Sequence, residues 1–446
     1  MKQNNLTEGK ILPSLLGFAV PVFFTMLLQF LYGTVDMFVV SRFASTAEAS
    51  GVTTGSIIMA TLTNAVTGLT TGVSVLVAQR IGERDYEGSG RVVGGGIALF
   101  AFVAAALTVA VPLLAESFAH MMDAPSEAYE ATASYIRITG LGSVFIIAYN
   151  VLGGIFRGLG DSRTPLFTVA VAAVVNLIFD IVLVRGFGMG AAGAAVATVA
   201  AQGISVAISL VAIRRTGLPF AVSKQIFAGK KASVGAIVRL GLPVAVQNLL
   251  SSFSFVIIQA LINGLSLAAS VGAGIGDKVG GILLLLPASY LQAMSAFVAQ
   301  NIGAKKRERA KLGLMWGIIT ALGFGIITAY ISVVHGDFLG SLFTNEPEVI
   351  KNAHWYIASA YGVDCMLTAV LFCLVGYFNG NGKTVFSLVQ GLFGAFVIRL
   401  PYAFFASSLA NTNIFFIGLA APVSSFFQII LCVIEYIRFE KNASRE

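Results

Sequence analysis

One twenty-residue stretch returns in similar form in the second half of this chain. Residues 77–96 read VAQRIGERDYEGSGRVVGGG, and residues 298–317 read VAQNIGAKKRERAKLGLMWG, 221 residues later. A second pair, GIFRGLGDSRT in the first half and GYFNGNGKT in the second, keeps the same spacing to within one residue. Matches that fall at polar loops, keep their order and share one offset argue against chance similarity between apolar segments. The sequence therefore predicts two copies of one unit, over residues 10–215 and 235–440.

The composition indicates that most of the chain lies in lipid. Of its 446 residues, 57% are hydrophobic and only 11% are charged, and the mean hydropathy is +0.87, whereas soluble domains carry about 25% charged residues. This composition excludes a soluble enzyme, a disordered chain and a nucleic-acid-binding domain. The three cysteines lie in apolar runs without metal-ligand spacing, which excludes a disulfide scaffold.

Twelve apolar stretches are long enough to cross a bilayer as helices, which takes about 20 residues. They lie at 14–38, 52–78, 92–118, 132–156, 164–184, 190–213, 237–262, 270–299, 312–334, 354–377, 384–408 and 413–437. The runs are too long and continuous for a β-barrel. Six spans per copy give both copies the same orientation, so we expect an all-α integral membrane protein with two six-helix lobes, related by a pseudo-two-fold axis along the membrane normal.

The basic residues predict the orientation of these spans. If the N-terminus is inside, 22 of the 28 Lys and Arg residues fall in inside loops and tails, and only Arg42, Arg185 and Lys351 fall outside. Because basic residues are enriched in cytoplasmic loops, we expect a multi-pass protein of the cell inner (plasma) membrane with both termini in the cytoplasm. The polar N-terminus lacks the features of a signal peptide.

This topology divides the chain into five parts. They are an N-terminal tail 1–13, an N-lobe 14–213, a cytoplasmic linker 214–236, a C-lobe 237–438 and a C-terminal tail 439–446. The inside segment that contains the linker, residues 214–239, carries six basic residues, which suit a surface near anionic lipid. A topology signal without a binding partner is the preferred interpretation of these charges.

Four carboxylates lie at predicted bilayer depth, where an acid is costly and is first interpreted as functional. Asp36 ends the first span, with Tyr32 and Gln29 on the same helical face. Asp180 lies in the fifth span, with Asn176 four residues before it. Their oxygen atoms suit a small hard cation such as Na⁺, or a shared proton. The alternative is structural: each acid lies near a span end, where it could be hydrated or paired with a loop arginine.

The second half holds the other two acids. Asp277 lies in a glycine-rich stretch beside Lys278, and Asp364 lies in the tenth span. A structural role and a functional role are both open for these acids, and Arg399 is a candidate partner for either. Gln259, in the seventh span, is a further candidate for substrate contact.

Two prolines occupy corresponding places in the first and seventh spans. Pro21 and Pro243 each remove a helical hydrogen bond and allow a kink, so they predict either moving parts of a transporter or static bends. The sequence contains no GxxxxGK[ST] loop for ATP, and its three histidines are isolated from one another. Energy must therefore come from an ion gradient or from a partner subunit.

These motifs and their order resemble the multidrug and toxic compound extrusion (MATE) family of secondary transporters. The resemblance rests on LGFAVPVFFTMLLQFLYGTVDMFVVSRF in the first span, on VAQRIGERD and FRGLGDSRTP, and on VAQNIGAKKRERA and GYFNGNGKT in the second half. It covers essentially the whole chain. It implies a V-shaped pair of lobes around a central cavity and export of organic cations coupled to inward Na⁺ or H⁺ flow.

The resemblance also implies roles for particular residues. In one branch of the family, a first-lobe pocket contains an acid in span one, an Asn-x-x-x-Asp in span five and a Thr in span six, joined by a polar residue from span four. The matching positions here are Asp36, Asn176, Asp180 and Thr198, and Asn150 is the span-four candidate. Tyr32 matches an aromatic position of the same pocket. Another branch relies on a glutamate in the seventh span, which here holds no acid, so we expect coupling in the first lobe.

The sequence thus predicts an ion-coupled multidrug antiporter that works by alternating access and binds no cofactor, ATP or nucleic acid. Its expected partners are small, cationic and amphipathic substrates and the lipid bilayer, and we expect a monomer. One alternative is a flippase for a lipid-linked oligosaccharide, but only Arg137, Lys278 and Arg399 lie within spans to meet an anionic headgroup. A channel or a membrane scaffold would not need carboxylates inside one lobe.

Overall fold

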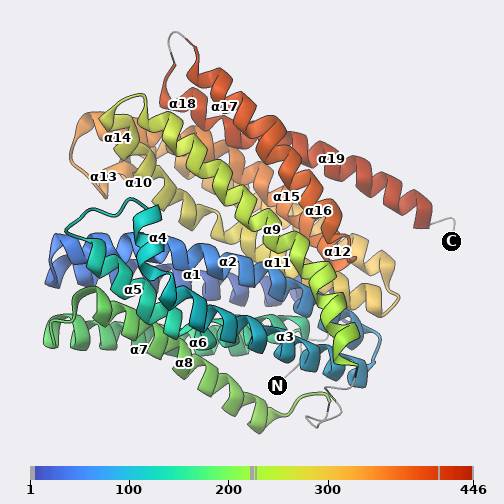
Figure 1. Cartoon of the computed structure of the whole chain (residues 1–446). Coiled ribbons are helices and arrows are strands. Elements are labelled where there is room, and N and C mark those ends of the chain that lie inside the picture. The colour runs from blue at the N-terminus through green and yellow to red at the C-terminus, as the bar shows by residue number, and fades with distance from the viewer. Residues whose placement is uncertain (1–5, 221–225, 227–228, 410–411, 444–446) are drawn as a thin grey trace. The chain divides into compact units, whose positions relative to one another are not determined.

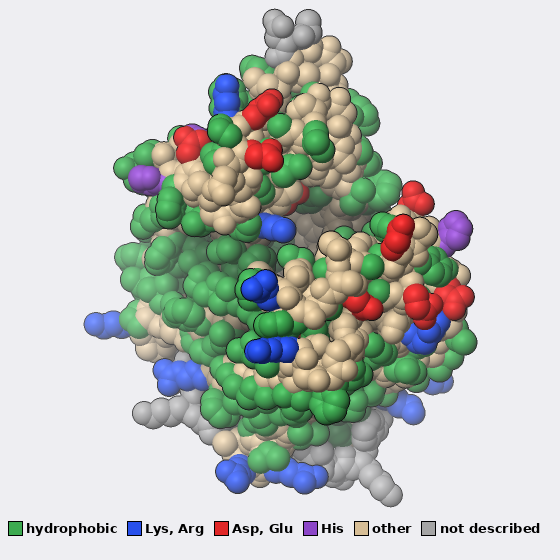
Figure 2. Space-filling model, turned by 90° about the vertical axis from the view of Figure 1, so that its left-hand side faces the viewer, with side chains coloured by type: hydrophobic (Ala, Val, Ile, Leu, Met, Phe, Trp, Pro, Cys, Tyr) green, Lys and Arg blue, Asp and Glu red, His purple; other side chains and the backbone are tan. Residues whose placement is uncertain are grey.

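The structure is a computed structural model that describes residues 6–220, 226, 229–409 and 412–443. Every regular element in these residues is helical, which confirms the predicted all-α fold. Parts of the predicted tails and linker lie outside the described residues, namely 1–5, 221–225, 227–228 and 444–446. Figure 2 shows broad areas of hydrophobic side chains on the face in view, as expected of a surface that meets lipid.

Two helical series follow one another along the chain (Figure 1). The first comprises α1 Ile11–Phe43, α2 Thr46–Gly82, α3 Tyr86–Leu113, α4 Ala115–Met121, α5 Tyr129–Leu141, α6 Ser143–Gly158, α7 Arg163–Asp180, η1 Ile181–Gly186 and α8 Gly190–Thr216. The second comprises α9 Lys230–Asn263, α10 Leu267–Leu283, α11 Leu285–Gly303, α12 Arg307–Val334, α13 Gly336–Ser341, α14 Pro347–Tyr356, η3 Ile357–Gly362, α15 Val363–Gly380, α16 Thr384–Leu392, η4 Phe393–Arg399, α17 Leu400–Ser407, α18 Ile414–Gly418 and α19 Ala420–Ala443. The η segments are π-helical.

The described residues supply up to twelve membrane spans, in agreement with the predicted number. Eleven continuous stretches are long and apolar enough to cross a bilayer, and the pair α5–α6, bent by 56°, makes a twelfth. The bend lies at Gly142, where an added Cβ would overlap the side chain of Val199 on α8. Glycine thus allows the broken span to approach its neighbour closely.

The predicted repeat is visible in the backbone of its loops. Arg84 and Lys305, 221 residues apart, both adopt a positive φ, of 61° and 58°. The N–H of the next residue then bonds back to the carbonyl of Arg80 at 2.9 Å in the first loop, and to that of Asn301 at 2.8 Å in the second. These are equivalent helix C-caps, each closed by a residue in the left-handed region.

Helix packing repeats as well. On α6, a Cβ added to Gly158 would lie 2.7 Å from the carbonyl oxygen of Ser74 on α2. On α15, a Cβ added to Gly380 would lie 2.8 Å from the carbonyl oxygen of Ser295 on α11. Both glycines belong to a GxxxG pattern, which lets membrane helices approach closely. The α2–α6 and α11–α15 contacts therefore form equivalent centres of the two halves.

The described chain divides into two compact units. One contains Val20–Ala245, and the other contains Leu6–Ala19 together with the residues from Val246 onward. Both division points fall inside helices, in α1 and in α9, within three residues of Pro21 and Pro243. The first part of each of these two helices thus belongs to a different unit from the rest of the helix.

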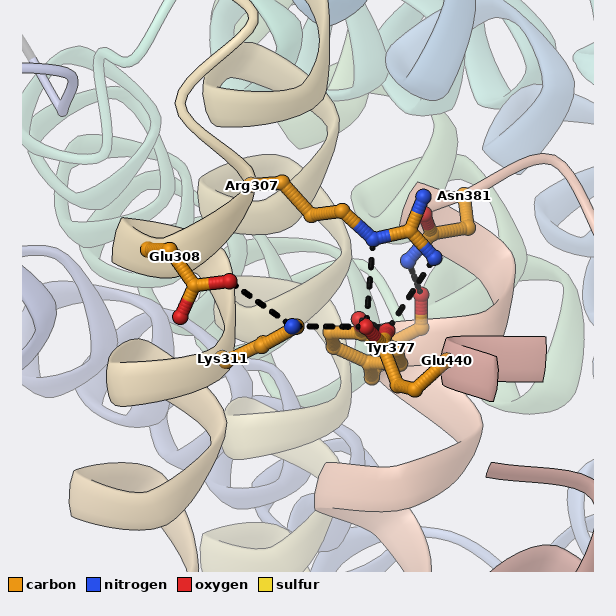
Figure 3. Close-up of polar contacts among 6 residues, drawn as sticks. All are labelled: Arg307, Glu308, Lys311, Tyr377, Asn381 and Glu440. Carbon is orange, nitrogen blue, oxygen red and sulfur yellow. Dashed lines mark hydrogen bonds and ion pairs between the residues drawn. The ribbon is translucent and has the colours of Figure 1, made fainter. Parts of the chain in front are cut away.

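A charged cluster joins three helices of the second unit (Figure 3). Glu440 on α19 accepts hydrogen bonds from Arg307 on α12, at 3.2 Å to each carboxylate oxygen, and from the Tyr377 hydroxyl on α15, at 2.6 Å. Lys311 lies 2.9 Å from Glu440 and 2.8 Å from Glu308. Because the Glu440 side chain is only 14% exposed, two cations and a hydroxyl compensate the cost of burying its charge.

Candidate functional site

Asp36 and Thr198 form the centre of a buried polar site in the first unit. The Thr198 hydroxyl on α8 donates to Oδ2 of Asp36 on α1 at 2.8 Å. Asp36 is 5% exposed, and its other oxygen, Oδ1, has no hydrogen-bond partner among the described residues. A carboxylate with one satisfied oxygen in a dry setting has room for one further ligand.

Asn176 and Asp180 lie beside this carboxylate and are fully buried. Among the described residues, neither polar atom of the Asn176 amide and neither oxygen of Asp180 has a hydrogen-bond partner. Each unpaired buried group costs about 1–3 kcal/mol, and more if it is charged. Such groups require an explanation. A proton shared by the two acids, a water molecule or a small cation would satisfy several of these atoms at once.

The backbone changes its winding directly after Asp180. Helix α7 ends at this residue and continues as the π-helical turn η1, Ile181–Gly186. Segments of π-helix inside α-helices are rare and often occur at functional sites. Glycine at position 193 permits close contact at this point, since an added Cβ would lie 3.3 Å from the backbone of Leu183.

A small hollow adjoins the site. Tyr32, Tyr149, Asn176 and Gln202 line it together with small apolar residues, and it has room for about one water molecule. Tyr32 and Asn176 were predicted, whereas Tyr149 and Gln202 were not. Helical spacing could have identified Gln202, because it lies four residues after Thr198 on the same face.

Two other predicted first-lobe residues, Gln29 and Asn150, do not line this hollow. The Gln29 amide donates to the hydroxyl of Tyr149. Asn150 instead donates to the carbonyl oxygen of Ile146 at 2.8 Å and accepts from Thr67 at 3.3 Å. The residue of α6 that contacts the first span is therefore Tyr149, next to the predicted Asn150.

The second unit holds a different polar arrangement. Thr368 donates to Asp364 at 2.9 Å. Arg399 is 9% exposed, donates to the Ser254 hydroxyl at 3.2 Å, and lies 4.5 Å from the centre of the Phe255 ring. Its charge also acts on Asp364. A resident guanidinium thus lies near this acid, in contrast to the Asp36–Asp180 pair.

Asp277 is linked to this pair through Tyr361, which interacts electrostatically with Asp364 and with Arg399. Tyr361 donates to Asp277 at 2.7 Å, and Gln259 donates to Asn263 on its own helix at 2.8 Å. The π-helical segments η3 and η4 adjoin Asp364 and Arg399, since η3 ends two residues before the acid and η4 ends at the arginine.

Comparison with known proteins identifies the family. The MatE family model matches the chain twice, at residues 21–182 and 243–405. The chain belongs to the MatE family. It is therefore a membrane transporter and not an enzyme. The two matches begin 222 residues apart, within one residue of the offset of the repeat predicted from the sequence.

Relatives of this MatE protein match over most of its length. "Probable multidrug resistance protein YpnP" of Bacillus subtilis is 25% identical over 432 residues, covering 96% of this chain and 95% of that protein. A "FAD transporter" of Shewanella oneidensis is 23% identical and covers 94% and 91%. Among solved structures, the "outward-facing conformation of a multidrug resistance MATE family transporter of the MOP superfamily" has a TM-score of 0.91, 19% identity and coverage of 99% and 98%. This likeness shows a common fold.

The first-unit site of this MatE chain offers only oxygen ligands and one amide. Within the described residues, no three His, Cys, Asp or Glu side chains are grouped to hold a metal ion. The Asp36 and Asp180 carboxylates, the Asn176 carbonyl and the Thr198 hydroxyl are hard ligands. They fit a proton or a small monovalent cation better than a tightly held transition metal.

Proposed function

We propose that this protein exports organic cations in exchange for H⁺ or Na⁺, and that Asp36 and Asp180 form the site where the ion binds. One observation carries the proposal. Two carboxylates and an amide lie side by side in the first unit, buried, with five side-chain atoms that lack partners among the described residues. This arrangement is incomplete without a positive charge.

The chemistry of the pair suggests how exchange would work. Two nearby carboxylates in a dry site repel each other, so the pair favours a bound cation. The hollow beside them has room for about one water molecule, which suits a proton or a Na⁺ ion, and an organic cation would compete for the same negative charge once α1 moves and the site opens. An ion taken up outside would displace the substrate, and its release inside would restore a negative site for the next one. This competition supplies the differential affinity that an antiporter requires.

Helix α1 is the proposed moving element. Asp36 and Pro21 lie on this one helix, and Pro21 lies where the helix passes from one compact unit to the other. Pro21 has no N–H for the carbonyl of Gly17, four residues earlier. Thr25 donates to the Pro21 carbonyl at 2.7 Å, a side-chain bond of the kind that often accompanies a bent helix. Ion binding at Asp36 would change how α1 bends at this point.

The relatives support drug substrates more than lipid-linked sugars. Several of them are named as probable multidrug resistance proteins, and the proposed site is acidic. We place the protein in the cell inner membrane with both termini in the cytoplasm, because the basic loops lie on one side of the twelve spans. It would act as a monomer on amphipathic cations.

Efflux of ethidium from cells tests this proposal. Wild type, Asp36→Asn and Asp180→Asn are compared while external pH and Na⁺ are varied independently. We expect both variants to lose efflux at normal expression, and the pH or Na⁺ dependence of the wild type to identify the ion. Asp123→Asn is the matched control, since Asp123 is exposed and has a φ of 50° that asparagine tolerates.

Two results would contradict cation antiport through Asp36 and Asp180. If wild type moves no ethidium, or if Asp36→Asn and Asp180→Asn pump normally, cation antiport through this pair is wrong. Transport of an anionic cargo, such as a lipid-linked oligosaccharide or a dinucleotide, then becomes the next function to test.

A further inference from the structure

An apolar groove of about 400 Å³ lies in the first unit, apart from the acidic site. Three membrane helices form its walls, with Ile97 on α3, Ile147 on α6 and Leu210 on α8 among the lining residues. Every side chain that lines it is hydrophobic. Ile97 and Leu210 are 42% and 48% exposed, so the groove is not enclosed within the unit.

Two described residues that follow α8 also border the groove. Phe220 and Ile226 both line the groove and pack on α3. A Cβ added to Gly90 would lie 3.1 Å from the Phe220 ring, and Gly94 lies directly under Ile226. The glycines of the repeated motif thus seat the linker against α3, and they fix the groove at the linker end of the three spans.

Lipid is the medium around such a surface. All three helices are long and apolar enough to cross a membrane, α6 as part of the bent span. Because every side chain that lines it is hydrophobic, a groove between such helices suits acyl chains better than water. A chain lying in a concave groove gains dispersion contacts on several sides, which a flat helix face does not offer.

A basic residue lies at the linker end of the groove. Arg214 follows Leu210 by four residues on α8, which places it on the helical face that lines the groove. Arg215 is next to it, and both arginines are exposed. On α3, Ser89 precedes Val93 by four residues, and its buried hydroxyl has no partner among the described residues. Basic pockets between membrane helices on the cytoplasmic side bind anionic headgroups.

We propose that this groove binds one anionic phospholipid, with an acyl chain between α3, α6 and α8 and the headgroup phosphate at Arg214. The site is separate from the transport pathway, because an organic cation would find no acidic side chain among the lining residues. The bound lipid would contact Phe220 and Ile226 of the linker, so it would stabilise the packing of these two residues on α3. The basic linker then has a binding role in addition to its topology signal.

Native mass spectrometry of the purified full chain tests this proposal. Phosphatidylglycerol and phosphatidylcholine with identical acyl chains are added separately, and the singly lipid-bound fraction is measured. Wild type should retain phosphatidylglycerol about five-fold better than phosphatidylcholine, the ratio that corresponds to about 1 kcal/mol for one basic residue at an anionic headgroup. Arg214→Gln should remove this preference without weakening phosphatidylcholine binding.

A second variant tests the groove itself. Ala101→Phe places a ring in the groove and should reduce retention of both lipids. Ala105→Phe is the matched control, because Ala105 is exposed on the same helix one turn away and does not line the groove. Thermal unfolding of each variant checks the fold.

Three results would overturn the proposal. They are equal retention of the two lipids by wild type, an unchanged lipid preference in Arg214→Gln, and retention by Ala101→Phe equal to that of Ala105→Phe. If ethidium competes with phosphatidylglycerol for the same bound state in wild type, the groove is a substrate entry site instead.

Discussion

At the scale of residues, some buried polar groups of the first unit have hydrogen-bond partners and others have none. Thr198 satisfies one oxygen of Asp36 at 2.8 Å, whereas Asn176 and Asp180 have no hydrogen-bond partner among the described residues. In the second unit, Asp364 Oδ1 and Arg399 Nε also lack partners among the described residues, but there the charge of Arg399 acts on Asp364. This contrast is the physical reason to assign ion coupling to the first unit.

Thr198→Val removes the only hydrogen bond found for the Asp36 carboxylate in the described chain. A hydrogen bond to a charged group is worth about 1.5–3 kcal/mol, so ion affinity should change by about ten-fold or more. If the coupling ion is H⁺, the variant should hold its proton more tightly and transport should shift to higher pH. If it is Na⁺, half-maximal transport should need more Na⁺.

The control for this prediction is Thr198→Ser, which keeps the hydroxyl and should retain the wild-type profile. Ethidium efflux measured against pH and against Na⁺ decides between the outcomes. Identical profiles for Thr198→Val and wild type would mean that the Asp36–Thr198 bond has no part in coupling.

The Glu440 cluster makes a prediction about stability. Glu440→Gln leaves Arg307 and Lys311 without their shared carboxylate (Figure 3). Breaking a partly buried ion pair should cost about 2 kcal/mol, so the unfolding temperature in detergent should fall. Glu435→Gln, on the same helix, should leave it unchanged. Equal unfolding temperatures for the two variants would contradict this role for Glu440.

At the scale of elements, α1 carries both the proposed ion ligand and a proline. Pro21 lacks an N–H, so one carbonyl of the preceding turn loses its helical bond. Pro21→Ala restores this bond, and we expect a folded protein with slower efflux and unchanged ethidium binding. The rate of ethidium efflux and the equilibrium binding of ethidium are measured for Pro21→Ala and for Pro243→Ala, which changes the corresponding proline of α9. Wild-type efflux in Pro21→Ala would show that α1 does not need to bend.

The residues that lead into α1 are bound to basic side chains at the start of α12. Arg309 donates to the carbonyl oxygens of Leu6, Glu8 and Gly9 at 2.7–3.2 Å, and Lys306 donates to that of Thr7 at 2.8 Å. Arg309→Gln should therefore speed hydrogen exchange in residues 6–15 while leaving exchange around Asp36 unchanged. Lys351→Gln serves as the control. Unchanged exchange in residues 6–15 would rule out this anchoring role.

The sequence predicted the number of spans and the internal repeat. The twelve spans agree because each needs only a long apolar run, and the repeat agrees because its loops need particular caps, as at Arg84 and Lys305. The π-helical turn after Asp180 and the bend at Gly142 were not predicted. Both depend on which neighbour a helix meets, and apolar periodicity does not report this.

At the scale of the whole molecule, the two compact units begin and end at other residues than the two predicted lobes. Hydropathy assigns α1 to the first half, whereas packing groups Leu6–Ala19 with the second unit. For the site, the pattern predicted Asp36, Asn176, Asp180 and Thr198, which lie together. The role of Asn150 stays a prediction, and its neighbour Tyr149, which was not predicted, accepts a hydrogen bond from Gln29. Adjacent residues on a helix point in different directions, so Tyr149 and Asn150 face different neighbours. The sequence alone does not show which of the two faces the first span, because that depends on how α6 packs.

The most direct test of the account is ion release on substrate binding. Tetraphenylphosphonium, a lipophilic cation, is added to purified protein in detergent, and released H⁺ and Na⁺ are measured together with the bound substrate. We expect one ion to be released for each tetraphenylphosphonium bound by wild type, and none in the Asp36→Asn, Asp180→Asn double variant. Substrate binding by wild type without ion release, or equal release by the double variant, would contradict the shared site.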